Sequence, residues 1–97
     1  MDITIHTLKF DADVKLTNFI ENKLSKLPKY HEDIQSIEVT LSLLPDFDNK
    51  NVMMKIFIPG NDLVIERRAQ KFEDAVVECK MVLKDLLVKA KEKKRNI

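Results

Sequence analysis

The residues best suited to chemistry in this 97-residue sequence are cations that share one side of a helix predicted near its end. On a wheel of about 100° per residue, one flank carries Lys80, Lys84, Lys91 and Arg95. The opposite flank carries Asp74, Glu78, Asp85 and Glu92. Opposite charges four residues apart would stabilise the helix. Sorted charges instead favour contact with an anion, and nucleic-acid phosphate is the leading candidate.

The same segment carries the apolar stripe of an amphipathic helix that packs on a core. The stripe consists of Phe72, Ala75, Val76, Cys79, Val82, Leu83, Leu86, Leu87 and Ala90. Val77, Met81 and Val88 fall outside the stripe, on the outward face between the two charged flanks. Two interpretations stay open for these three residues: scattered surface exposure, which is common, or a protein contact.

Residues for catalysis or metal binding form no recognisable constellation. Neither His6 nor His31 has a metal ligand at suitable spacing, so both are expected at the surface or at a strand edge. Asp46 and Asp48 resemble part of a calcium loop, but the required glycine and terminal glutamate are missing. A sequence with one glycine has no glycine-rich phosphate loop. We therefore expect no enzyme, metal site, cofactor or small-molecule substrate.

Composition predicts one globular domain over residues 1–97, in which residues 91–97 are open to fraying. Charged residues make up 34% and hydrophobic residues 44%. The lone Cys79 is expected to be a small core residue. No signal peptide and no apolar run of the ~20 residues of a membrane span is visible, so a cytoplasmic protein is expected.

Apolar alternation and helical spacing predict the elements that position the lysines. The expected order is a strand at 2–7, a helix from an N-cap at Asp13 to about Leu27, strands at 36–43, 52–58 and 63–66, and the last helix. Pro28 is expected at or just past the end of the first helix, and Gly60 at a positive φ in the turn 59–62.

This order predicts an α+β fold, β-α-β-β-β-α, with a four-stranded mixed sheet. Strands one and two should be parallel across the first helix, and the other neighbours antiparallel. Each helix has one apolar stripe, so both should cover the same sheet face. The other face should see solvent, and it contains Thr40, Lys55, Phe57, Val64 and Glu66.

Positive charge also collects on the first helix, where residues 15–29 hold four lysines against one acid, Glu21. Lys15 and Lys26 flank its apolar stripe, and Lys23 falls inside it, so its stem should lie on apolar surface. These lysines either solvate the helix or form a second cationic edge.

The whole chain resembles the short ribosome hibernation-promoting factors, also called ribosome-associated translation inhibitors, ribosomal subunit interface proteins or sigma(54) modulation proteins. The resemblance rests on Ile3-Thr4-Ile5, on residues 16–27 with Lys29-Tyr30 after them, on Asp74-Ala75-Val76, and on the lysine spacing of residues 83–93.

The resemblance implies a fold akin to double-stranded-RNA-binding domains and a non-catalytic factor that inhibits translation in slow growth, stationary phase or stress. It implies binding in the small ribosomal subunit, over the sites that mRNA and tRNA use, and no membrane partner. A monomer off the ribosome is expected, with weak self-association left open. By position, the rRNA-binding lysines are Lys23, Lys26, Lys29, Lys84, Lys89, Lys91 and Lys93, to which the charge sorting adds Lys80 and Arg95.

Three positions depart from the family pattern. Lys71 stands where an aspartate usually precedes the last helix, and Val77 stands where an acid is usual. Asp85-Leu86 replaces an Arg-Gln pair that many members carry, and because Asp85 lies on the acidic flank, a weaker rRNA contact and a lower affinity are expected. The competing hypothesis is a protein-interaction module that uses Val77, Met81 and Val88.

Overall fold

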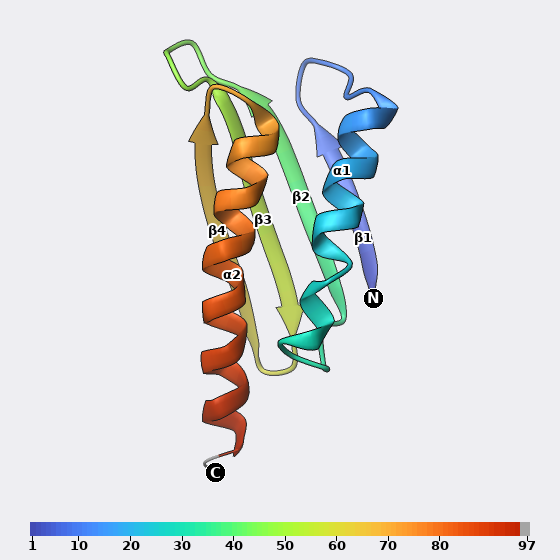
Figure 1. The fold of residues 1–97 in the computed structure, drawn as a ribbon, viewed down its shortest axis with the longest axis vertical. Helices are drawn as coiled ribbons and strands as arrows, with labels where there is room; N and C mark the ends of the chain where they lie inside the picture. Colours follow the sequence, from blue (N-terminus) through green and yellow to red (C-terminus); the bar gives the residue numbers. More distant parts are fainter. Residues whose placement is uncertain (96–97) are drawn as a thin grey trace.

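The computed structural model describes residues 1–95, and their side chains up to Lys93. Its elements are β1 (Asp2–Thr7), α1 (Val14–Leu24), a 3-10 turn η1 (Leu27–Lys29), β2 (Ser36–Leu43), β3 (Lys50–Ile58), β4 (Asn61–Ala69) and α2 (Phe72–Arg95) (Figure 1). The predicted α+β class and the order β-α-β-β-β-α are confirmed.

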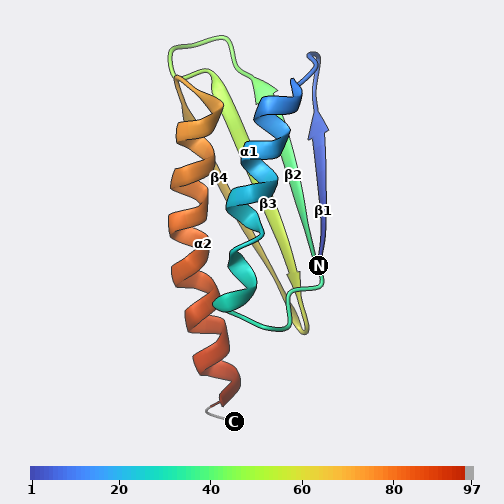
Figure 2. The same cartoon turned by 45° about the vertical axis from the view of Figure 1, so that its right-hand side comes forward.

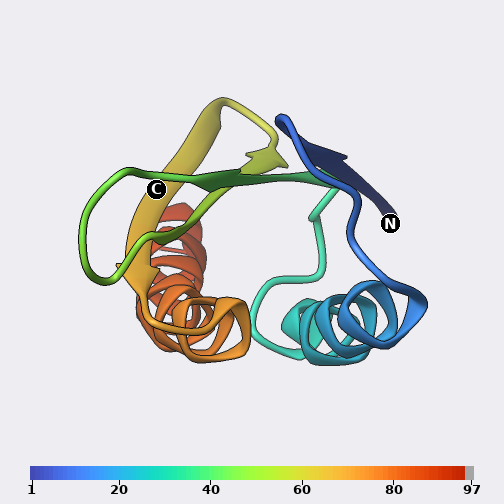
Figure 3. The same cartoon turned by 90° about the horizontal axis from the view of Figure 1, so that it is seen from above.

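The sheet has the strand order β1-β2-β3-β4. β1 and β2 are parallel, with Ile3 opposite Ile37, and α1 connects them. β2, β3 and β4 form an antiparallel meander, as their short connections predict. Seen from above, both helices lie on one side of the sheet, which confirms the predicted two-layer arrangement (Figure 3).

The core lies between the sheet and the two helices. Val39, Leu41 and Met54 of the sheet are fully buried, as are Leu24 of α1 and Leu83 of α2. α2 packs on β3 and β4, and α1 lies beside α2 on the same face (Figure 2). Burial of each such side chain stabilises the fold by about 1.5–3 kcal/mol.

The sheet face away from the helices is open, as the alternation predicts. Val64 and Glu66 are exposed on it, and Thr40 is half-buried. Lys55 and Phe57 shield each other in part, because the Lys55 ammonium lies 5.0 Å from the centre of the Phe57 ring.

Four element boundaries differ from the prediction by two or three residues, including the starts of β3 and β4, which come earlier than predicted. α1 ends at Leu24, and Leu27 begins the 3-10 turn, in which Pro28 is the second residue, where its missing N–H is tolerated. β4 continues through Arg67 and Arg68 to Ala69. An edge strand tolerates such exposed charges, so loss of apolar alternation did not mark its end.

The predicted cap of the first helix and the predicted glycine turn are both confirmed. The Asp13 carboxylate accepts a hydrogen bond of 2.7 Å from the Leu16 N–H and caps α1. Gly60 has a φ of 79° in the turn between β3 and β4.

α2 is helical to Arg95, and Asn96 and Ile97 lie outside the described residues, so fraying over 91–97 stays a prediction.

Cys79 is the small core residue that its place in the stripe predicts. Its side chain is fully buried, and its Sγ donates a hydrogen bond to the Val52 carbonyl at 3.7 Å. Burial raises the pKa of the Cys79 thiol from 9.0 to about 11, which keeps the thiol protonated at neutral pH. A reactive thiolate is therefore not available here.

We expect Asp13→Ala to lower the free energy of unfolding by about 0.5–2 kcal/mol, because the Leu16 N–H loses its capping acceptor. Urea denaturation followed by circular dichroism measures the change. Asp11→Ala is the matched control, since Asp11 is exposed in the same loop and lies before the cap. Equal losses in the two variants would contradict the capping role.

Candidate nucleic-acid interface

The end of α1 and the 3-10 turn after it position three lysines close to α2. Leu24 and Leu27 are fully buried and anchor this stretch to the core. Lys26 and Lys29 are exposed. Lys23 is half-buried, as its place within the stripe predicts, and its ammonium lies 5.5 Å from the centre of the Phe19 ring.

The middle of α2 supplies two further lysines one helical turn apart, Lys80 and Lys84. They follow directly after the buried Cys79 and Leu83, whose packing fixes the rotation of the helix. Lys80 is half-buried and Lys84 is exposed. Because α1 and α2 contact each other, this flank of α2 borders the lysines of α1.

Tyr30 is where the two groups of lysines meet. The centre of its ring lies 5.1 Å from the Lys29 ammonium and 5.4 Å from the Lys84 ammonium. Its ring therefore joins a lysine of the 3-10 turn to a lysine of α2. We call Lys23, Lys26, Lys29, Lys80 and Lys84 the lysine cluster.

Like charges within the cluster affect one another. Partial burial, then the charges of Lys26 and Lys23, lower the pKa of Lys80 from its ordinary value of 10.5. Within the described part of the chain, the ion pairs join Lys55 to Asp62 at 4.0 Å and Lys91 to Glu32 at 3.1 Å, and neither includes a cluster lysine. The cluster thus concentrates positive charge with no paired carboxylate, which suits an external anion.

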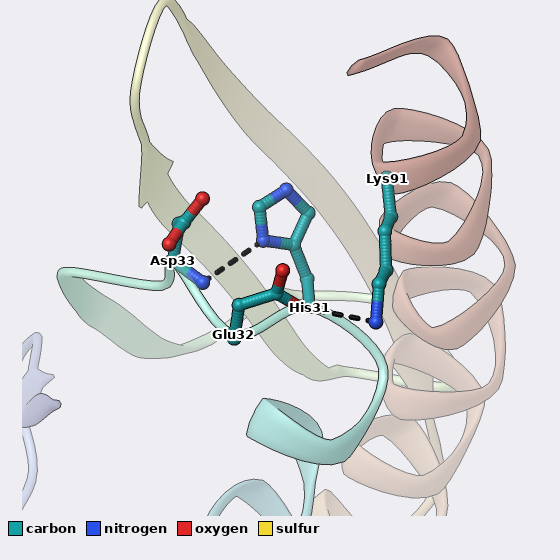
Figure 4. A network of polar contacts seen from close by, with 4 residues as sticks. All are labelled: His31, Glu32, Asp33 and Lys91. Atoms are coloured by element: carbon teal, nitrogen blue, oxygen red, sulfur yellow. Dashed lines mark hydrogen bonds and ion pairs between the residues drawn. The ribbon is translucent and has the colours of Figure 1, made fainter. Parts of the chain in front are cut away.

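The other cations predicted to bind rRNA do not join the cluster. Lys91 forms its ion pair with Glu32, in the segment between the 3-10 turn and β2 (Figure 4). Lys93 lines a separate hollow beside the β3–β4 turn. Lys89 is exposed but lies five residues after Lys84, a helical rotation of about 140° away from the cluster. The Arg95 side chain lies outside the described residues.

The apolar strip predicted on α2 divides into two parts. Val77, Met81 and Val88 are all exposed, by 38%, 64% and 36%. Val77 and Met81 line a hollow together with cluster lysines, and Val88 is not among its lining residues. The structure therefore places two of the three residues at the cationic surface itself.

The expectation that both histidines lie at the surface is wrong for His31. His6 is exposed on the edge strand β1, whereas only 3% of His31 is exposed. The His31 Nδ1 accepts a hydrogen bond of 3.1 Å from the Asp33 N–H (Figure 4). His31 thus closes the turn that connects Tyr30 to β2, which is a structural role. Within residues 1–93, no group of three or more His, Cys, Asp or Glu side chains is arranged to hold a metal ion.

The family model described as sigma 54 modulation protein / S30EA ribosomal protein matches residues 3–95. The chain belongs to this family. The match includes both helices and thus the whole lysine cluster. No sequence among the curated proteins matches this chain.

Two solved structures of low sequence identity share the fold. A ribosomal subunit interface protein from Coxiella burnetii is 20% identical, with a TM-score of 0.87 over 95% of this chain and 99% of that chain. The N-terminal domain of protein Y from Thermus thermophilus is 18% identical, with a TM-score of 0.81 over 92% of this chain and 98% of that domain. No helix in the described part of this family member is long and apolar enough to cross a membrane.

Tyr30 is the residue of the site that reasoning from spacing missed. The sequence analysis identified Tyr30 only through the family pattern that places a tyrosine after Lys29. Its position between two ammonium groups depends on how α1 and α2 pack, which a linear pattern does not contain.

We expect Lys23→Gln to raise the pKa of Lys80 toward 10.5, because removal of a nearby positive charge favours the protonated ammonium. NMR titration of the lysine side chains measures this shift. Lys89→Gln is the control, since Lys89 lies on another face of α2, and it should leave Lys80 unchanged. An unchanged Lys80 pKa in Lys23→Gln would show that the two charges are not coupled.

Proposed function

We propose that this protein binds the small ribosomal subunit at the decoding region and inhibits translation by sterically excluding mRNA and tRNA. The single observation that carries the proposal is the lysine cluster, in which α1, the 3-10 turn and α2 bring together five cations that form no ion pair with any described residue. Family membership supports a ribosomal partner. The protein would act in the cytoplasm without catalysis, in slow growth, stationary phase or stress.

The mechanism rests on phosphate contacts. Lysines that neutralise backbone phosphates release condensed counterions, so the affinity should fall steeply as salt rises. Structured RNA is recognised largely by its shape and backbone, which suits a cluster of flexible ammonium groups held on a rigid two-layer scaffold. Lys91 stabilises this scaffold through Glu32, and its role as a direct rRNA ligand is the weaker part of the proposed set.

A second candidate function is a protein-interaction module that uses Val77, Met81 and Val88. The exposure of all three side chains favours it. Val88 separates the two proposals, because it is exposed but does not line the cationic hollow.

We expect Lys26→Glu combined with Lys84→Glu to weaken binding to small ribosomal subunits by more than about tenfold, because two cations of the cluster become anions. Co-sedimentation with purified subunits at moderate salt measures the loss, and circular dichroism checks the fold. Both side chains are exposed, so folding should be preserved.

The matched control is Lys9→Glu with Lys71→Glu, which makes the same charge change at two exposed lysines outside the cluster. This control should retain most of the affinity. Equal binding by the cluster variant and the wild type would rule out the proposed interface, and equal losses in both variants would reduce it to general attraction by charge.

Neutral substitution of single lysines tests the phosphate contacts separately. We expect Lys84→Gln to reduce the slope of log affinity against log salt concentration by about one, as for loss of one phosphate contact. Lys89→Gln should leave the slope unchanged. Binding titrations at four salt concentrations measure both slopes, and a wild-type affinity that does not vary with salt would contradict the mechanism.

The protein-interaction candidate predicts that Val88→Ala abolishes capture of a protein partner, with wild-type affinity for rRNA. Pull-down of ribosomal components followed by mass spectrometry, with this variant and the wild type as parallel baits, measures the loss. Identical partner sets for the two baits would remove this candidate.

A further inference from the structure

A hollow between α1 and α2 lies within the lysine cluster. Its lining residues are Lys23, Tyr30, Val77, Lys80, Met81 and Lys84. Its volume is about 240 Å³. Sites that enclose a whole small molecule usually measure about 300–1,000 Å³, so this hollow suits one part of a larger ligand.

The lining has two chemically different parts. Lys23, Lys80 and Lys84 contribute ammonium groups, and no carboxylate of the described residues lines the hollow. Met81, Val77 and the Tyr30 ring contribute apolar and aromatic surface beside them. A ligand that matches both parts carries an anion and a flat apolar group close together, which is the composition of a nucleotide.

We propose that this hollow receives one unpaired nucleotide of a structured RNA, with its phosphate on Lys80 and Lys84 and its base against Met81 and Tyr30. The inference rests on the proposed RNA-binding function and adds to it a site for a single base. It also assigns Met81, which is 64% exposed, a role other than contact with a protein.

Tyr30 is suited to exchange one partner for another. The Lys29 and Lys84 ammonium groups lie over its ring at 5.1 and 5.4 Å. A phosphate attracts an ammonium more strongly than a ring does, because the contact is a charge-assisted hydrogen bond. Arrival of the phosphate would therefore draw Lys84 from the ring and leave the ring to the base.

The charge around the hollow favours RNA over an acidic peptide. Lys26 and Lys29 extend the cationic surface beyond the three lining lysines, and Lys26 is close enough to lower the pKa of Lys80. A continuous polyanion gains from release of counterions along the whole cluster. Unpaired RNA bases are commonly bound by stacking on aromatic side chains, which an acidic peptide does not reproduce.

The test compares two RNA hairpins of equal length, one fully paired and one with a single-nucleotide bulge, by fluorescence anisotropy at fixed salt. Wild-type protein should bind the bulged hairpin about fivefold or more tightly than the paired one. A bulge that lacks its base should lose this preference. Equal wild-type affinity for the bulged and paired hairpins would overturn the inference.

Met81→Ser should abolish the preference and retain the affinity for the paired hairpin, and Tyr30→Leu should abolish the preference as well. Met81→Ser alters an exposed position on α2 and keeps the test valid if Tyr30→Leu does not fold. Val88→Ala is the matched control, because this exposed apolar residue of α2 does not line the hollow. This variant should keep the wild-type preference for the bulged hairpin. Preference retained in Met81→Ser, or lost equally in Val88→Ala, would contradict the site.

Failure of this inference can be told apart from failure of the proposed function. Lys26→Glu with Lys84→Glu should weaken binding to both hairpins and to small subunits. If that variant binds weakly while the wild type shows no preference for a bulge, the result supports the lysine interface and rules out the nucleotide site. If that variant binds small subunits with wild-type affinity, the proposed function itself is contradicted. Competition by poly-glutamate as effective as competition by the bulged hairpin would exclude an RNA nucleotide as the specific ligand.

Discussion

Burial of two apolar stripes on one sheet face is the force that holds lysines of like charge together. Leu83 in α2 and Leu24 in α1 are fully buried against the same core, and this packing fixes which way the intervening lysines point. Repulsion between surface charges about 4 Å apart costs roughly 1–4 kcal/mol, whereas each large buried side chain contributes about 1.5–3 kcal/mol. Stacking of Phe10 on Phe72, with ring centres 5.2 Å apart, adds a contact between the loop before α1 and the start of α2. Partial burial and then repulsion from Lys26 and Lys23 lower the pKa of Lys80.

Features that depend on neighbours in the chain could be predicted from the sequence. Alternation of Ile37, Val39 and Leu41 with polar residues identifies β2, and the carboxylate of Asp13 marks the start of α1, because both signals act over a few residues. Gly60 is similarly local, since one positive φ in a hairpin turn is enough to favour glycine. The two cationic helices also followed from local spacing, and family membership confirms the resemblance.

Features that depend on how separate elements meet could not be predicted. Lys91 shares a flank with Lys80 on a wheel, yet it pairs with Glu32 because the segment after the 3-10 turn passes beside that end of α2. His31 is buried because it belongs to the same segment, and nothing in the residues around it marks a buried imidazole. Tyr30 lies between lysines from two elements for the same reason. In each case the decisive contact joins residues that are far apart in the chain and that only tertiary packing brings together.

The parallel pairing of β1 with β2 has a consequence for the order of folding. β2, β3 and β4 pair with their immediate neighbours in the chain, so their loops close early and at small entropic cost. β1 has no partner until β2 has formed, and α1 must be accommodated in the crossover between them. α2 completes the other side of the same layer by packing on β3 and β4. The two groups of lysines meet only where α1 and α2 pack side by side on the sheet, so the lysine cluster depends on the complete fold.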